Sequence, residues 1–185
     1  MPWRRWAKFP RVDDSGLGPR DVVVPLIYLL RHGMTTGDAA DPPLSEAGAL
    51  RMEREARGMA RLALRFDAIV SSPLIRAAQT AQIVSRALSH EGVMAAEEAL
   101  GSGCTLGRLA QVLARHAAAR SVLVVGHQPD MGRLAAQMVG SRSPVPFHKG
   151  TLCCVEVPRW PAPRDDPKGA LTFLLPPEIL EALSP

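Results

Sequence analysis

The sequence predicts an α/β protein in which a mostly parallel β-sheet is covered by helices on both faces. Short apolar runs of strand length alternate with longer segments of helical periodicity along most of the chain. The 185 residues are 46% hydrophobic and 22% charged, values close to those of ordinary globular domains. These observations exclude a largely disordered chain and favour one hydrophobic core.

The expected elements follow one another with short loops between them. The predicted strands are Val22–Leu30, Phe66–Val70, Val93–Ala96, Ser121–Val125, Thr151–Val157 and Ala170–Leu175. The predicted helices are 45–64, 74–88, Leu106–His116, Pro129–Val139 and Glu178–Leu183. Ser45 is the expected N-cap of the first helix, and Gly140 closes the fourth. The Pro- and Asp-rich stretch 158–168 is expected to join two antiparallel strands.

Residues 1–20 hold most of the excess positive charge. The chain has a formal net charge of +4, and this segment contributes five basic and two acidic side chains. The body is therefore nearly neutral, which argues against a nucleic-acid-binding surface there. We expect residues 1–20 to form a flexible basic arm and residues 21–185 to form a single domain.

Targeting signals and covalent cross-links are not expected. The arginines of the N-terminal segment are not followed by the apolar region of a signal peptide, and no apolar run approaches the length of a membrane span. The three cysteines, Cys104, Cys153 and Cys154, form neither a disulfide framework nor a zinc-ligand spacing. A reducing cytoplasm is the compartment that fits best.

Histidine and arginine side chains follow three of the predicted strands. Arg31 and His32 end the first strand, Arg76 follows the second, and His127 follows Gly126 at the end of the fourth. Ligands of open α/β sheets bind at the carboxyl ends of the strands, where helix N-termini add positive potential. The pattern therefore predicts a pocket for a tetrahedral oxyanion, most simply a phosphoryl group.

Each of these residue types suits a step of phosphoryl transfer. Arg31 and Arg76 can each bind two phosphoryl oxygens. A neutral histidine can attack phosphorus through its free ring nitrogen, and an adjacent arginine disfavours its protonation. His32 is the expected nucleophile, because it directly follows a strand and Gly33 permits a close turn. His127 is then expected to donate a hydrogen bond to a phosphoryl oxygen.

Metal binding is the main alternative role for the two histidines. Two arginines in the same pocket would repel a cation, and no carboxylate stands at a ligand spacing from His32 or His127. We therefore expect neither a metal nor another cofactor. The remaining histidines, His90, His116 and His148, are expected to be structural.

The motifs together resemble those of the histidine phosphatase superfamily, also called phosphoglycerate-mutase-like. The resemblance rests on Arg31-His32-Gly33, on the stretch 71–81 and on Val124-Val125-Gly126-His127, in that order, and spans about residues 26–175. It implies a phosphohistidine intermediate on His32, with the other three side chains forming the phosphate pocket. It also implies a three-layer sandwich whose six-stranded sheet has one antiparallel edge strand.

Within that superfamily the short chain resembles the SixA-type phosphohistidine phosphatases. The stretch 42–48, Pro-Pro-Leu-Ser-Glu-Ala-Gly, is similar to the helix start of that branch. Met34 departs from the pattern, because relatives usually carry an acidic or polar residue there. For the general acid, Glu97 and Glu98 are the nearby carboxyl groups, and Glu98 is preferred because the SixA type has a glutamate before leucine.

Three functions compete at this point. The first is a metal-independent phosphatase acting on protein phosphohistidine, whose imidazole leaving group departs more readily than an alkoxide. The second is the same chemistry on a small phosphorylated metabolite, and the third is a non-catalytic module that binds phosphate or a phosphoprotein. The expected partner is accordingly a phosphorylated protein domain or a small phosphorylated substrate. We expect a monomer that binds neither nucleic acid nor membrane.

Overall fold

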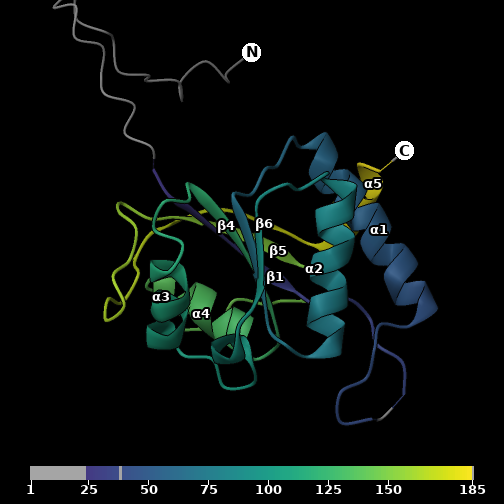
Figure 1. Ribbon diagram of the computed structural model, residues 1–185, viewed down its shortest axis with the longest axis horizontal. Coiled ribbons are helices and arrows are strands. Elements are labelled where there is room, and N and C mark those ends of the chain that lie inside the picture. Colours follow the sequence, from purple (N-terminus) through teal and green to yellow (C-terminus); the bar gives the residue numbers. More distant parts are fainter. Residues whose placement is uncertain (1–23, 38, 185) are drawn as a thin grey trace, which may run out of the picture.

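The computed structural model describes residues 24–37 and 39–184. Its centre is a six-stranded sheet with the order β3-β2-β4-β1-β5-β6 (Figure 1). The strands are β1 (Leu26–Arg31), β2 (Ala68–Ser71), β3 (Val93–Ala96), β4 (Ser121–Gly126), β5 (Leu152–Glu156) and β6 (Ala170–Leu175). The predicted arm, residues 1–20, lies outside the described residues.

Helices cover both faces of the sheet, as the sequence predicts. They are α1 (Glu46–Arg61), α2 (Ile75–Ala87), α3 (Leu106–Ala114), α4 (Asp130–Met138) and α5 (Pro177–Ala182). Helices α1, α2 and α5 lie on one face, and α3 and α4 lie on the other (Figure 1). Two hydrophobic clusters fill the spaces between these layers. The fold class is confirmed as a three-layer α/β sandwich.

One detail of the sheet differs from the expectation. Strands β3, β2, β4 and β1 are mutually parallel, and the reversed strand is β5, which pairs antiparallel with both β1 and β6. The reversed strand is therefore one place in from the edge. The physical reason is the loop 157–169, which returns the chain directly alongside β5, so that β6 pairs with the strand edge that β5 would otherwise expose.

Local signals set most element boundaries. Strand β1 begins at Leu26, later than expected, and is preceded by Pro25, which has no N–H to donate to a neighbouring strand. Helix α1 begins where predicted, because the Ser45 hydroxyl accepts a hydrogen bond from Gly48 N–H at 3.0 Å. The 3-10 turn η2 (Glu98–Leu100) was not anticipated.

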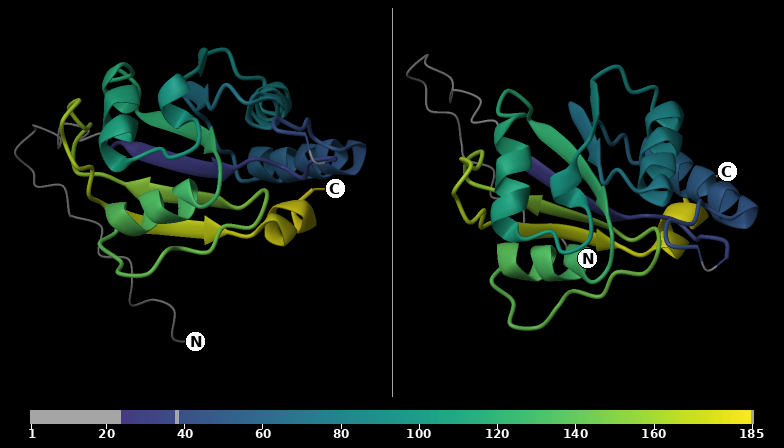
Figure 2. Two further views of the ribbon diagram at one scale, coloured as in Figure 1. Left: turned by 90° about the horizontal axis from the view of Figure 1, so that it is seen from below. Right: turned by 60° about the horizontal axis from the view of Figure 1, so that its bottom comes forward.

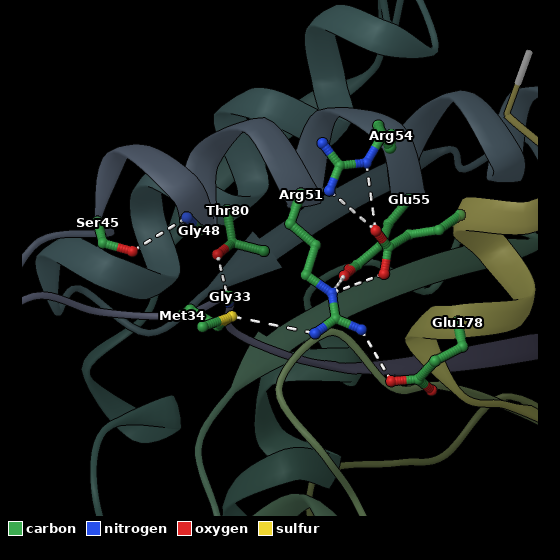
Figure 3. Close-up of polar contacts among 10 residues, drawn as sticks. Gly33, Met34, Ser45, Gly48, Arg51, Arg54, Glu55, Thr80 and Glu178 are labelled. Carbon is green, nitrogen blue, oxygen red and sulfur yellow. Dashed lines mark hydrogen bonds and ion pairs between the residues drawn. The ribbon is translucent and has the colours of Figure 1, made fainter.

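Helix α5 packs against α1, as both views in Figure 2 show. The contact requires a glycine at position 58, because a Cβ there would collide with the carbonyl group of Leu180. Ion pairs close the same interface: Arg51 of α1 binds Glu178 at 2.8 Å and Glu181 at 2.7 Å (Figure 3). The C-terminal helix thus anchors the helix that follows the first motif.

No helix in the described part of the chain is long and apolar enough to span a membrane.

Candidate active site

Three strands end level with one another and place the predicted residues together. In the parallel sheet, Arg31 of β1 stands opposite Gly126 of β4, and Val125 stands opposite Ser71 of β2. The residue after β1, His32, continues the pairing through its N–H, which donates to the Gly126 carbonyl at 3.1 Å. The rings of His32 and His127 consequently lie with their centroids 5.2 Å apart.

His32 is arranged to attack through Nε2. Its Nδ1 lies 2.8 Å from the Gly33 carbonyl oxygen, which only accepts, so Nδ1 carries the proton and donates it. Burial lowers the pKa of His32 to about 4, and the charges of Arg76 and Arg31 act in the same direction, as does His127. At neutral pH the ring is therefore neutral, and Nε2 keeps the lone pair that a nucleophile needs.

Arg31 and Arg76 bring two guanidinium groups to this pocket. Arg31 donates from Nη1 to the Phe147 carbonyl at 2.8 Å, while its Nε is buried and has no partner among the described residues. Arg76 lies in the first turn of α2 and is mostly buried. Unpartnered buried donors are costly, so an anion that accepts from Arg31 Nε would be stabilised here.

His127 offers a second unpartnered donor. Ser72 Oγ accepts from Leu74 N–H at 3.3 Å and lies 2.8 Å from His127 Nε2, to which it can donate its own proton. That arrangement leaves the proton of His127 on Nδ1, which is buried without a partner in the described chain. Burial lowers the pKa of His127 to about 4, with Arg76 as the next cause, so this ring is also neutral at pH 7.

Thr80 connects the nucleophile to the helix that carries Arg76. Its hydroxyl accepts from Gly33 N–H at 3.1 Å (Figure 3). It donates to the Arg76 carbonyl at 2.8 Å. The side chain is fully buried. The motif 71–81 contains Thr80, but its sequence position indicated only a helical residue. Its role depends on a contact 47 residues away, which no local pattern reveals.

Replacing Thr80 with valine is expected to lower both stability and turnover. Valine has nearly the same shape but leaves the buried Gly33 N–H without an acceptor, which costs about 1–3 kcal/mol. The His32 segment would also lose its link to α2. Thr80→Ser, which keeps the hydroxyl, is the matched control and should retain more activity at equal temperature. Chemical denaturation and steady-state kinetics measure the two effects; equal kinetics for both variants would contradict this role.

Asp41 lies beside the pocket, although no motif in the sequence predicted a role for it. Its Oδ1 and Oδ2 accept from Ile75 N–H at 3.1 and 3.0 Å, and Oδ1 pairs with Arg76 Nη1 at 3.1 Å. Helix α2 has no capping side chain of its own, so this carboxylate caps it from a distant loop. The only sequence signal was an aspartate in a loop next to two prolines.

No hydrogen bond or ion pair joins Glu98 to His32 or His127 among the described residues. Glu98 begins η2 after β3, and β2 and β4 stand between β3 and β1. With about 4.8 Å between neighbouring strands, the ends of β3 and β1 lie roughly 14 Å apart. Glu98 is exposed and makes no side-chain hydrogen bond or ion pair with the described residues, while its neighbour Glu97 pairs with Arg115.

Position 34 has a methionine where the family resemblance led us to expect an acidic or polar residue. Met34 is exposed, and its Sδ lies 4.0 Å from Arg51 Nη1 (Figure 3). Arg51 instead pairs with Glu55 of its own helix at 3.3 Å and with Glu178 and Glu181 of α5. Arg51 thus has carboxylate partners although position 34 carries no charge.

Two neutral histidines and two arginines converge at the carboxyl edge of an α/β sheet, and this set of side chains suits a phosphatase. Residues 27–100 match the family model of the histidine phosphatase superfamily (branch 1). An uncharacterised protein of Picosynechococcus sp. is 36% identical over 118 residues, covering 59% of this chain and 70% of that protein. The chain belongs to the histidine phosphatase superfamily.

Solved structures agree with this fold. The protein histidine phosphatase SixA, determined with tungstate, superposes with a TM-score of 0.72 at 23% identity, covering 84% of this chain and 99% of SixA. SixA from Agrobacterium tumefaciens gives 0.68 at 25% identity, covering 82% and 97%. A mycobacterial glucosyl-3-phosphoglycerate phosphatase gives 0.59 at 16% identity, covering 81% and 98%.

Proposed function

We propose that this protein is a metal-independent phosphatase that carries the phosphoryl group on His32 and acts on protein phosphohistidine. The observation that carries the proposal is the state of His32: a buried, neutral ring whose Nδ1 donates to Gly33 and whose Nε2 is free to attack. Arg31, Arg76 and His127 would hold the three phosphoryl oxygens. In-line attack with charge stabilisation is what phosphoryl transfer requires.

The unpartnered donors support an anionic ligand. Arg31 Nε and His127 Nδ1 are buried without partners in the described part of the chain, and they flank the nucleophile. A phosphoryl group would accept from both. The SixA structure with the TM-score of 0.72 was determined with tungstate, which is itself a tetrahedral oxyanion. Binding alone would not need a free ring nitrogen on His32, so turnover is favoured over a recognition module.

Two observations favour a protein substrate over a small metabolite. Met34 and Ile75 are exposed apolar side chains that stand within two residues of His32 and Arg76 in the chain. Exposed apolar side chains near a polar pocket suit contact with another protein surface. In addition, no hydrogen bond or ion pair links Glu98 to His32 or His127 among the described residues, and an imidazole leaving group needs no such proton donor.

A comparison of three substrates in the presence of a chelator tests this function. Phosphohistidine in a peptide and p-nitrophenyl phosphate both have leaving groups that depart without help, whereas phosphoserine needs a proton donor. We expect kcat/KM on phosphoserine to be roughly 10²–10⁴-fold below that on phosphohistidine. Comparable values on phosphoserine would favour a metabolite phosphatase. No turnover of any of the three would favour the phosphate-binding module.

A further inference from the structure

The loop between β1 and α1 places a carboxylate against a phosphate-binding arginine. Asp41 accepts two hydrogen bonds from Ile75 N–H and pairs with Arg76 at 3.1 Å. Among the described residues it is the one carboxylate that pairs with Arg31 or Arg76. Burial and Arg76 lower the pKa of His127, and the negative charges of Asp130 and then Asp41 oppose this lowering. Asp41 therefore belongs to the pocket itself.

The exposed fractions show that Asp41 is more open to solvent than the histidines and Arg76. They rise from 4% for His127 and 6% for His32 to 15% for the Arg76 side chain and 31% for that of Asp41. His32 is therefore buried, whereas Asp41 is partly open to solvent. In-line transfer needs a water molecule to reach phosphorus while the phosphoryl group is on His32. Asp41, partly exposed beside the phosphate-binding Arg76, is a carboxylate that such a water can reach.

Other carboxylates near the sheet edge are already committed or distant. Asp130 accepts from Gly103 and Cys104 N–H at 2.7 and 3.1 Å, and its other oxygen lies 3.5 Å from Arg133. Glu97 pairs with Arg115, and Glu98 stands at the far edge of the sheet. Asp41 Oδ2 has one partner, Ile75 N–H, and keeps a lone pair for another donor; its side chain is 31% exposed, against 5% for Asp130, so water can reach it.

We propose that Asp41, and not Glu98, is the catalytic carboxylate of this enzyme, and that it acts as general base when water hydrolyses phospho-His32. The proposal rests on the proposed function above. In this step a water oxygen bonds to phosphorus while its proton passes to Asp41 Oδ2. The bond between phosphorus and Nε2 breaks, and its electron pair returns to His32. Inorganic phosphate and neutral His32 are formed, and Asp41 releases the proton to solvent.

The first transfer step does not need Asp41. A substrate phosphohistidine that is protonated on its second ring nitrogen loses the phosphoryl group as neutral imidazole, because the electron pair of the broken bond stays on the departing nitrogen. His32 receives the phosphoryl group on Nε2, while its Nδ1 proton stays on the ring and donates to the Gly33 carbonyl. The phosphoryl donor and the phosphoryl acceptor are therefore both imidazole rings protonated on the other nitrogen.

Rapid-quench kinetics of Asp41→Asn on a ³²P-labelled phosphohistidine peptide test this assignment. Asparagine keeps an oxygen that accepts from Ile75 N–H and Arg76, so the α2 cap is retained. We expect a burst close to one equivalent of released peptide, accumulation of phospho-His32, and steady-state turnover reduced by roughly 10²–10⁴-fold. Glu98→Gln is the matched control and should accumulate no phosphoenzyme. If Asp41→Asn is unstable, Asp41→Ser replaces it in the same experiment, with the same expected result.

The outcomes separate a catalytic role from a structural one. If Asp41 only positioned Arg76, Asp41→Asn would slow the burst itself and weaken inhibition by inorganic phosphate. For a catalytic Asp41 we expect the inhibition constant of phosphate in Asp41→Asn to stay within about threefold of the wild-type value. Wild-type turnover in Asp41→Asn, loss of the burst, or accumulation of phosphoenzyme in Glu98→Gln would each overturn the assignment. If the wild-type protein forms no phosphoenzyme at all, the proposed function fails instead.

Discussion

Turnover of every phosphorylated substrate is expected to stop when His32 is replaced by asparagine. The amide N–H of asparagine can take the place of Nδ1–H at the Gly33 carbonyl, but the variant has no atom at the position of Nε2. Removing the nucleophile from a set of catalytic residues that act together lowers kcat by about 10⁵–10⁶-fold. No acid-labile phosphoenzyme should form after incubation with labelled phosphohistidine peptide.

The same variant should still bind inorganic phosphate. The donors of Arg31, Arg76 and His127 remain, and a neutral histidine contributes no charge to anion binding. Calorimetric titration with phosphate measures this directly. His90→Asn is a matched control, because His90 precedes β3 at the opposite end of the parallel strands and should leave both turnover and binding unchanged. A phosphoenzyme in His32→Asn would show that another residue is the nucleophile.

The sequence was sufficient to predict the positions of the site residues that end or follow strands. Arg31, His32 and His127 are placed by the backbone: each ends or follows a parallel strand, and parallel strands end at a common edge. Their convergence could therefore be predicted from the order of apolar runs and the residues after them. The same reasoning located α2 and hence Arg76 in its first turn.

Residues whose roles depend on contacts distant in sequence could not be predicted in this way. Asp41 contacts Ile75 across 34 residues, and Thr80 contacts Gly33 across 47. The position of β5 within the sheet depended on how the chain returns to pair β6 with it. Glu98 was preferred because of its neighbours in sequence; it follows β3, which is an edge strand of the sheet. Spacing along the chain does not encode these distances.

Glu55 is a buried carboxyl group that the phosphatase chemistry does not use. It lies on α1, is 1% exposed, and one of its oxygens has no partner among the described residues. Burial raises its pKa to about 8; Arg51 and Arg54 oppose this increase, and Glu181 and Glu178 of α5 add to it. Glu55 is therefore protonated in the folded protein at pH values where the unfolded chain has lost that proton.

The free energy of unfolding is consequently expected to be largest near pH 6.5. Between pH 4.5 and 6.5 the unfolded chain binds two more protons through His32 and His127, whose folded pKa values are about 4, while the folded protein binds one more through Glu55. Stability therefore rises with pH in this range by about 1.4 kcal/mol per unit. Above pH 6.5 only the Glu55 contribution remains, and stability falls with the same slope up to about pH 8.

Replacing Glu55 with glutamine should abolish the fall above pH 6.5. Glutamine keeps the shape of a neutral Glu55 but has no proton to lose, so the stability curve should become flat between pH 6.5 and 8. For the wild type, a loss of about 2 kcal/mol across this interval corresponds to roughly 4–8 °C in Tm for a chain of this size. Calorimetry of both proteins at several pH values measures the difference. Glu53→Gln, on the same helix, is the matched control and should reproduce the wild-type curve; parallel curves for Glu55→Gln and wild type would mean that Glu55 is ionised in the folded protein.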